Sequence, residues 1–201
     1  MNEYIVKEIK NNEFENIAKI HLDTFKNFFL SSLGENFLIH FYSSINKIEN
    51  SICLGLYFNN KLVGFAIGVN HMKSFYPNLF RKNFFQFFRI LIKKIIKNPK
   101  IFFLFYFKIF SRYISLRTIP DKGYYDLLSI CVCHEHQKLG QGNFLLSSFE
   151  KKVSEKSSNI SLTTDKFDNE SVINFYKKNG YDIVGNIVQN KRVLLKMFKK
   201  F

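Results

Sequence analysis

The sequence predicts an α+β domain, in which a central sheet is flanked by helices in three layers. Apolar segments of strand length, rich in β-branched residues, alternate with longer segments whose apolar residues recur at helical spacing. The 201 residues suffice for one substantial core, so we expect a single domain over 1–201. A strand, a glycine-containing turn and a helix follow one another directly over residues 126–146.

The N-terminal part predicts a strand, two helices and a strand hairpin. Residues 4–9 alternate in polarity, as a half-buried strand does, and a Ser-Ser-Leu-Gly turn separates the two helices. The dipeptide Asn59-Asn60 joins the hairpin strands, because Asn tolerates the positive φ of such turns. In chain order the predicted elements are strand 4–9, helices 13–29 and 35–48, and strands 51–58 and 61–69.

The segment 72–122 is a predicted helical insert, rich in basic and aromatic residues. Residues 71–125 hold twelve Lys or Arg and one acid, Asp121, so their charge is 12 − 1 = +11 of the chain's formal +14. A polar stripe at helical spacing predicts a helix that ends before Asn98-Pro99; its members are Lys82, Gln86, Arg89, Lys93 and Lys97. A second, almost wholly apolar helix is predicted over 101–113.

Three interpretations of this insert stay open. It forms a helical hairpin that packs on the sheet with a satellite aromatic core, or it contacts an anionic membrane surface through residues 72–117. Nucleic acid is the third and least supported partner. Its phosphates would attract the basic residues, but the aromatics are more continuous than stacking on a single strand needs.

The stretch 126–146 predicts a phosphate-binding turn. Residues 127–133 are apolar and rich in strand formers, residues 137–142 form a polar turn with two glycines, and helical spacing begins at Asn143. The first N–H groups of a helix attract an anion, because they lack partners and the helix dipole is positive there. Glycine lets the main chain approach a phosphate closely.

The C-terminal part predicts a strand, a helix and a final strand pair. The strand covers 159–164, and the helix covers 168–178 with Asp168 or Asn169 at its N-cap. Gly180 closes this helix as its C′ residue. Strands 181–188 and 192–198 follow, joined around Gln189-Asn190.

The cysteines and the N-terminus indicate the compartment. Cys53, Cys131 and Cys133 form no disulfide framework, so we expect buried thiols in a reducing cytoplasm. The string Cys-x-Cys-His-x-His matches no common zinc spacing, and no metal site is expected. Residues 1–10 lack the apolar core of a signal peptide, and no apolar run approaches the roughly 20 residues of a bilayer span. We therefore expect a cytoplasmic protein, peripheral at the inner membrane face if the insert contacts lipid.

Two motifs in this order resemble the GNAT N-acetyltransferases. The turn Gln137-x-x-Gly140-x-Gly142 is similar to their acetyl-CoA signature, although His134 replaces the proline that often precedes it. The later string Asn-x-x-Val-x-x-Phe-Tyr-x-Lys-x-Gly-Tyr, over 169–181, looks like their second cofactor motif. The resemblance covers most of the chain outside the insert, and it implies a mixed, mostly antiparallel sheet.

The resemblance also implies acetyl-CoA as the acyl donor. Asn169 would hydrogen-bond the pantetheine arm, and a main-chain N–H of the central strand would polarise the thioester carbonyl. The strand edge that would pair with the pantetheine amides is Ile130, Cys131 and Val132. The turn that would hold the pyrophosphate through its N–H groups is Gln137, Lys138, Leu139, Gly140, Gln141, Gly142 and Asn143.

The same resemblance suggests two catalytic residues. Tyr176 would protonate the leaving thiolate, since a phenol of pKa about 10 suits a thiol of pKa about 8.5; the alternative is a core aromatic. Asp126 is the candidate general base, because it stands eleven residues before Gln137, where histone-acetylating relatives place a glutamate. Its alternative is an exposed carboxylate at a strand end. Ser129 is a candidate for ordering a water.

The sequence does not identify the acceptor amine. A primary amine of a small acceptor, such as an amino sugar or a sugar nucleotide, suits a surface-bound enzyme. The main enzymatic alternative is a protein N-terminal or lysine amine. A non-catalytic acyl-CoA-binding module at a membrane surface is the alternative of another class.

Overall fold

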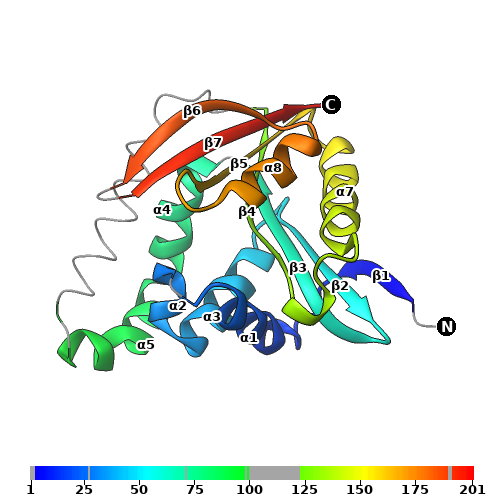
Figure 1. Cartoon of the computed structure of the whole chain (residues 1–201). Helices are drawn as coiled ribbons and strands as arrows, with labels where there is room; N and C mark the ends of the chain where they lie inside the picture. Colours follow the sequence, from blue (N-terminus) through cyan, green and yellow to red (C-terminus); the bar gives the residue numbers. More distant parts are fainter. Residues whose placement is uncertain (1–2, 27, 71, 98, 100–122, 190–191) are drawn as a thin grey trace.

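In the computed structural model, the strands form one mixed sheet with helices on both faces (Figure 1). The structure describes residues 3–26, 28–70, 72–97, 99, 123–189 and 192–201. The strand order is β1-β2-β3-β4-β5-β7-β6, and among the described strands only β4 and β5 pair in parallel. This confirms the predicted α+β fold with its mostly antiparallel sheet. The strands are β1 Tyr4–Glu8, β2 Ile52–Phe58, β3 Lys61–Asn70, β4 Tyr125–Val132, β5 Asn159–Asp165, β6 Asp182–Gln189 and β7 Arg192–Lys200.

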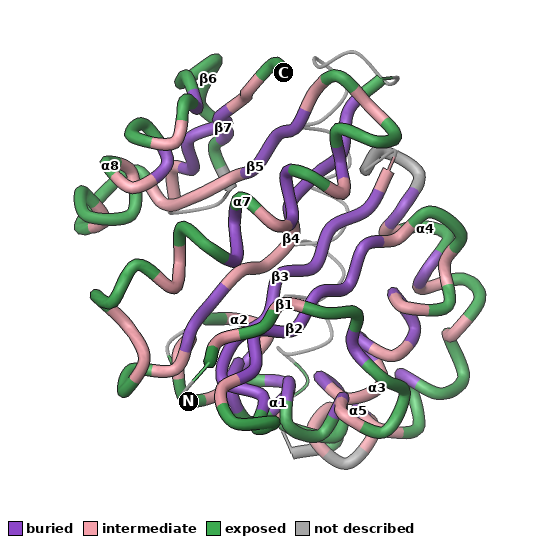
Figure 2. The backbone as a smooth tube through the Cα atoms, turned by 90° about the vertical axis from the view of Figure 1, so that its right-hand side faces the viewer, coloured by how far each residue is buried: buried purple, intermediate pink, exposed green. Residues whose placement is uncertain are grey.

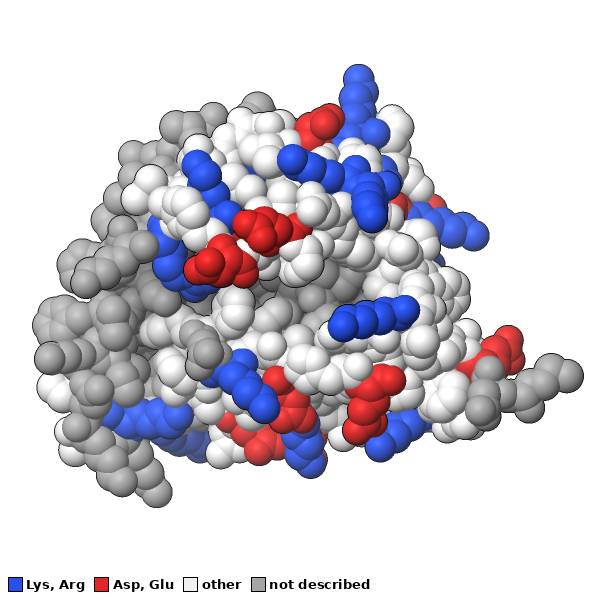
Figure 3. All heavy atoms as spheres, viewed as in Figure 1, with Lys and Arg blue, Asp and Glu red and all other residues white. Residues whose placement is uncertain are grey.

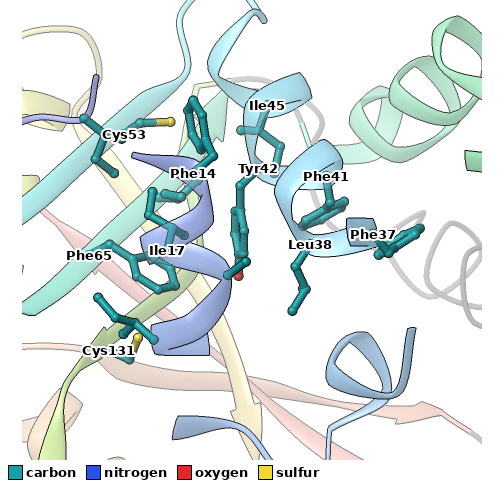
Figure 4. Packing of buried hydrophobic residues seen from close by; sticks show 14 of the residues in the cluster. Phe14, Ile17, Phe37, Leu38, Phe41, Tyr42, Ile45, Cys53, Phe65 and Cys131 are labelled. Atoms are coloured by element: carbon teal, nitrogen blue, oxygen red, sulfur yellow. The ribbon is translucent and has the colours of Figure 1, made fainter. Parts of the chain in front are cut away.

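The helices cover the two faces of the sheet unequally. Helices α1, α3, α4 and α5 bury apolar side chains in a core on one face, which Figure 4 shows from close by. Helices α7 and α8 pack on the other face, where Phe149 and Tyr176 are buried. Strands β2 and β3 are buried because they lie between both layers (Figure 2). The helices are α1 Phe14–Thr24, α2 Phe29–Leu33, α3 Glu35–Asn46, α4 Met72–Lys82, α5 Phe84–Lys97, α7 Gln141–Ser154 and α8 Glu170–Lys178.

Two predicted chain reversals are confirmed by their backbone angles. Asn59 and Asn60 have φ of 48° and 63°, as a tight hairpin turn requires, and they join β2 to β3. Gly180 has φ of 84° directly after α8, and the Tyr181 N–H donates to the Tyr176 carbonyl. A left-handed residue with such a bond ends a helix and satisfies its last carbonyls.

The predicted helix 13–29 is shorter in the structure. Helix α1 ends at Thr24, and Phe28 is extended before the short helix α2 begins. The Ser31 hydroxyl donates to the Phe25 carbonyl, which satisfies a backbone group near the end of α1. The serines of the predicted Ser-Ser-Leu-Gly turn therefore lie in α2, and only Gly34, with φ of 92°, is non-helical. Apolar spacing alone did not reveal this break, since Phe25 and Phe28 continue the pattern.

The first part of the insert packs on the core as two successive helices, α4 and α5. Helices α4 and α5 meet at Asn83, whose side chain donates to the Leu79 carbonyl at 2.9 Å. Phe75, Leu79, Phe87 and Leu91 are buried in the core below, so α4 and α5 both pack on it. The predicted hairpin pairs α5 with helix 101–113, so it stays a prediction. Helix α5 ends at Lys97, before Asn98-Pro99 as predicted. The predicted helix 101–113 lies outside the described residues.

Candidate active site

A gap between β4 and β5 is the main irregularity of the sheet. Past Leu127, β4 continues beside β3 to Val132, while β5 continues beside β7 to Asp165. The two parallel strands therefore separate toward their C-terminal ends (Figure 1). The positions at which they do pair are Tyr125 with Ile160, Asp126 with Ser161, and Leu127 with Leu162.

The β4 side of this gap presents backbone polar groups. The Cys133 N–H donates to the Val63 carbonyl at 2.8 Å, so it points toward β3. Because these groups alternate in direction along a strand, those of Ile130 and Val132 point into the gap. The Val132 carbonyl accepts a 2.7 Å hydrogen bond from the Gln137 side-chain amide, which ties the following turn to the strand. The Ile130 N–H and C=O are thus directed to where an extended amide chain would lie.

The turn before α7 has the backbone of an anion-binding loop. Lys138 and Gly140 have φ of 62° and 81°, and α7 begins at Gln141, slightly earlier than predicted. The first N–H to find a helical partner is that of Phe144, which donates to the Gly140 carbonyl. The preceding N–H groups of the first turn face outward with the positive end of the helix dipole. A Cβ added at Gly140 would meet no atom within 4 Å, so the space in front of the turn is open.

Asn169 connects the end of β5 to the start of α8. Its side-chain amide donates to the Thr164 hydroxyl at 2.7 Å and to the Asp165 carbonyl at 3.0 Å. Both donor hydrogens of the amide are used, so its carbonyl oxygen is the group left to accept a hydrogen bond from a ligand. Asn169 occupies the N-cap position by its backbone angles, as predicted, but makes no capping bond.

Tyr176 lies on the buried side of α8, in a core cluster that includes Val132 of β4 and Leu162 of β5. It contacts Phe175 and Tyr181 edge to face, with ring centroids 5.2 Å and 5.6 Å away. Burial raises the pKa of the Tyr176 phenol above its usual value, because the phenolate would lose its hydration. Among the described residues, no hydrogen bond engages its hydroxyl. A protonated phenol is therefore held in place with its O–H still to donate.

The structure argues against Asp126 as general base, and its alternative as an exposed strand-end carboxylate is wrong. Asp126 is 1% exposed, and its carboxylate accepts a 2.8 Å hydrogen bond from the Lys196 ammonium. The Ser161 hydroxyl donates to the same carboxylate oxygen. Its burial and these two partners keep the carboxylate away from a substrate amine. The sequence spacing between Asp126 and Gln137 gave no indication of Lys196, which lies on β7.

Two groups of polar residues near the gap carry no local sequence signal. On the α1–α3 face, the Tyr42 hydroxyl lies 2.7 Å from His21 Nδ1 and 3.4 Å from Ser129 Oγ. At the open end of the gap, Arg192 binds the Asp165 carboxylate through Nε at 3.0 Å and Nη2 at 2.5 Å. The helical spacing of His21 and Tyr42 predicts only that they face the core.

The Arg192 guanidinium also contacts an aromatic ring. It stacks 5.2 Å from the ring centroid of Phe28, which precedes α2. Because Asp165 ends β5 and Phe28 belongs to the α1–α2 connection, this contact links the end of β5 to that connection.

The sequence matches the model of the acetyltransferase (GNAT) family over residues 14–181. The chain therefore belongs to the GNAT acetyltransferase family, and it is an acetyl-CoA-dependent N-acetyltransferase. Curated proteins gave no significant match in sequence.

Solved structures show the same fold at low sequence identity. The PaiA N-acetyltransferase from Thermoplasma acidophilum, in complex with coenzyme A, is 14% identical with a TM-score of 0.58, over 99% of both chains. An aminoglycoside 6′-acetyltransferase type Ii is 16% identical with a TM-score of 0.62, over 98% of this chain and 96% of its own. The ribosomal-protein-S18-alanine N-acetyltransferase from Escherichia coli is 13% identical with a TM-score of 0.58, over 98% and 94%.

Proposed function

We propose that the chain transfers the acetyl group of acetyl-CoA to a primary amine of a small acceptor, such as an amino sugar or a sugar nucleotide. The observation that carries this proposal is the gap between β4 and β5, with the N-terminus of α7 at its β4 end. The Ile130 N–H and C=O point into this gap, and Tyr176 shares a buried cluster with Val132 of β4.

The donor would lie along β4. The outward N–H groups of residues 138–143 would hold the pyrophosphate, and the edge of Ile130–Val132 would pair with the pantetheine amides. The Asn169 side-chain carbonyl would accept a hydrogen bond from the same arm. The Ile130 N–H is the group aimed at the thioester carbonyl, where it would stabilise negative charge as the tetrahedral intermediate forms.

In the transfer, the amine nitrogen forms a bond to the carbonyl carbon and the carbon–sulfur bond breaks. The leaving sulfur takes the Tyr176 proton, the nitrogen releases one proton to water, and the tyrosinate regains one from water. Because burial raises the pKa of Tyr176, the phenol remains protonated between turnovers. Asp126 has no part in this proton balance.

Contacts at the end of β5 support a small acceptor. The Phe28–Arg192–Asp165 contact links the end of β5 to the α1–α2 connection and would hinder a folded protein surface there. A flexible N-terminal peptide or lysine side chain is the second candidate, because it needs less room than a folded surface. The aminoglycoside and ribosomal-protein enzymes of the same fold represent these two acceptor classes by their names.

The proposal is tested by thiol release from acetyl-CoA with a panel of amines. Glucosamine, an amino-sugar nucleotide, spermidine and an alanine-initiated peptide would be compared at equal concentration. We expect the amino sugars to support the fastest thiol release. A preference for the peptide would indicate a peptide acceptor in place of a small amine. Thiol release with none of these amines would contradict the proposed function.

We also propose that the insert contacts an anionic membrane surface. Phe84, Phe85 and Phe88 are 55%, 84% and 42% exposed, and the Phe84 ring contacts the other two. Residues 72–97 carry basic but no acidic side chains. Exposed aromatics beside basic residues favour the interface of anionic lipid. The described part of the face in Figure 3 carries basic and acidic side chains interspersed. None of the described helices is long and apolar enough to cross a bilayer.

A further inference from the structure

The Asn169 side chain has a defined orientation at the end of β5. One of its amide hydrogens is donated to the Asp165 carbonyl at 3.0 Å and the other to the Thr164 hydroxyl at 2.7 Å. Because a backbone carbonyl can only accept a hydrogen bond, the Asn169 atom that faces it must be the amide nitrogen. Oδ1 therefore faces away from the Asp165 carbonyl, and among the described residues it accepts no hydrogen bond.

The Asp165 carbonyl lies on the edge of β5 that borders the gap. The Lys166 N–H donates to the Val193 carbonyl of β7 at 2.9 Å. Since backbone groups alternate in direction along a strand, the N–H and C=O of Asp165 point away from β7, toward the gap. The Asn169 amide thus occupies the carbonyl that β5 would otherwise present at this level of the gap. An extended ligand there would find its partners on β4 and on Asn169 Oδ1.

The side chain of the same residue, Asp165, is held separately by Arg192. Asp165 pairs with Leu194 across β5 and β7, so Arg192, two positions before Leu194, is its diagonal neighbour on the same face of the sheet. The guanidinium binds the carboxylate through Nε at 3.0 Å and Nη2 at 2.5 Å. Two parallel bonds of this kind fix the relative orientation of the two groups as well as their distance.

The Arg192 guanidinium is itself held on one face. It stacks on the ring of Phe28, and that ring contacts the ring of Phe25 edge to face, with centroids 5.3 Å apart. A guanidinium that is stacked on a ring and makes two bonds in its own plane has little freedom to rotate. The Asp165 side chain is 26% exposed, so without Arg192 its carboxylate could turn to solvent.

We propose that Arg192 is a positioning residue for the donor: by holding the Asp165 side chain, it fixes the Asp165 carbonyl that orients Asn169. This inference rests on the proposed function, in which Asn169 Oδ1 accepts a hydrogen bond from the pantetheine arm. Arg192 itself touches neither the donor nor the reacting atoms. Its loss would let the last residue of β5 turn, and the Asn169 amide would no longer keep Oδ1 in one direction. The affinity for acetyl-CoA would fall, while the rate of transfer from bound donor would change little.

Calorimetric binding of acetyl-CoA tests this inference with Arg192→Ala, Asn169→Ala and their double variant. We expect each single change to weaken binding about three- to tenfold, as one hydrogen bond allows, with kcat nearly unchanged. The double variant should bind no more weakly than Asn169→Ala, since Arg192 acts through Asn169. Lys199→Ala is the matched control, because Lys199 also lies on β7 and forms a 2.7 Å ion pair, but with Glu150 of α7. It should bind acetyl-CoA like the wild type.

Two further variants separate orientation from charge. Arg192→Lys keeps the positive charge but cannot make two parallel bonds, so we expect it to recover only part of the affinity. The double variant Arg192→Ala with Asp165→Asn removes the unpaired carboxylate, and we expect it to bind as weakly as Arg192→Ala. Full affinity in either variant would show that Arg192 only offsets the charge of Asp165, and this would overturn the positioning role.

The Asn169 side-chain amide can also be followed by NMR in the free protein, without any donor. Both of its hydrogens are bonded, so we expect slower exchange with water than for the exposed Asn174. Arg192→Ala should speed this exchange, and Lys199→Ala should not. Unchanged exchange or unchanged affinity in Arg192→Ala would overturn this inference alone. Failure of the wild type to bind acetyl-CoA would overturn the proposed function together with it.

Discussion

Lys196 on β7 places its ammonium 2.8 Å from the Asp126 carboxylate on β4, although the two residues are 70 positions apart. Ser161, on the intervening β5, donates to the same carboxylate and accepts from Lys196 at 2.8 Å. Asp126 and Ser161 are partners in the short paired part of β4 and β5. The ion pair therefore fastens three strands together at the closed end of the gap.

Breaking this ion pair should lower the free energy of unfolding more than it lowers the catalytic rate of the folded protein. We expect Asp126→Asn to lower the free energy of unfolding by about 3–5 kcal/mol, because the Lys196 ammonium would stay buried without its carboxylate. Urea unfolding measures this. Replacing both residues by apolar ones, as Asp126→Leu with Lys196→Met, should cost less than the single change.

Turnover by Asp126→Asn then separates a structural role from general-base catalysis. At a temperature where the variant is folded, we expect kcat within a few-fold of the wild type. A loss of about 10²–10⁴-fold in a folded variant would instead support Asp126 as base. Asp182→Asn is the matched control, since Asp182 is an exposed residue of β6.

Tyr176→Phe should lower kcat about 10²–10⁴-fold and leave KM for acetyl-CoA nearly unchanged, because only the acid in the last step is lost. Since burial raises the pKa of Tyr176, the phenol stays protonated as pH rises, and the wild type should show no loss of kcat from this group below pH 10. Tyr181→Phe is the control, as its ring packs 5.6 Å from that of Tyr176. An equal loss in both variants would indicate a packing effect.

Gly140→Asp should abolish micromolar binding of acetyl-CoA, measured by calorimetry. The change places a carboxylate where the pyrophosphate would lie, and it strains a backbone with φ of 81°. Gly180→Ala is the matched control, because Gly180 has φ of 84° but closes α8. It should cost about 1 kcal/mol of stability and leave the affinity intact. Loss of binding in both variants would point to backbone strain rather than to the anion site.

His21 should make the protein less stable in mild acid. The unfolded chain takes up a proton near pH 6.5, whereas the buried His21 resists protonation until about pH 4. The free energy of unfolding should therefore fall by about 3 kcal/mol as pH drops through this window. His21→Gln should flatten that decline, and the exposed His134→Gln should not. An unchanged slope in His21→Gln would contradict the neutral buried imidazole.

Membrane contact should depend on the exposed aromatics of α5. We expect cosedimentation with phosphatidylglycerol vesicles to fall in Phe85→Ser with Phe88→Ser, and little binding to phosphatidylcholine vesicles. Phe167→Ser removes a ring that is 63% exposed outside the insert and serves as control. Equal binding by all variants, or none by the wild type, would remove the membrane proposal. Lys94 is a poor choice for mutation, because its ammonium donates to the Ser32 carbonyl at 3.0 Å.

The strands and most helices could be predicted because their signals are local. The Asn59-Asn60 turn, the Gly180 helix end and the alternation of β1 each depend on a few neighbouring residues. The break at Thr24 could not be predicted, because the apolar spacing runs on through it. It depends on a hydrogen bond from Ser31 and on packing beyond the helix.

The donor side of the candidate site also follows from contiguous residues. Gly140 and Gly142 stand at the start of a helix, and the open backbone of such a start is a property of the local chain. Asn169 and Tyr176 share one short segment, so their placement at the start and on the buried face of α8 was readable from spacing. The sequence by itself thus determined the family, the donor and the turn proposed to bind it.

Only the tertiary structure shows that Asp126 is half of an ion pair and which groups surround Ser129. Lys196 and Tyr42 reach these residues across 70 and 87 positions of sequence, from a strand and a helix that meet β4 only in the folded sheet. A carboxylate is a base or half of an ion pair according to what lies within about 4 Å of it. Packing sets that distance, so it cannot be derived from the spacing of residues along one strand.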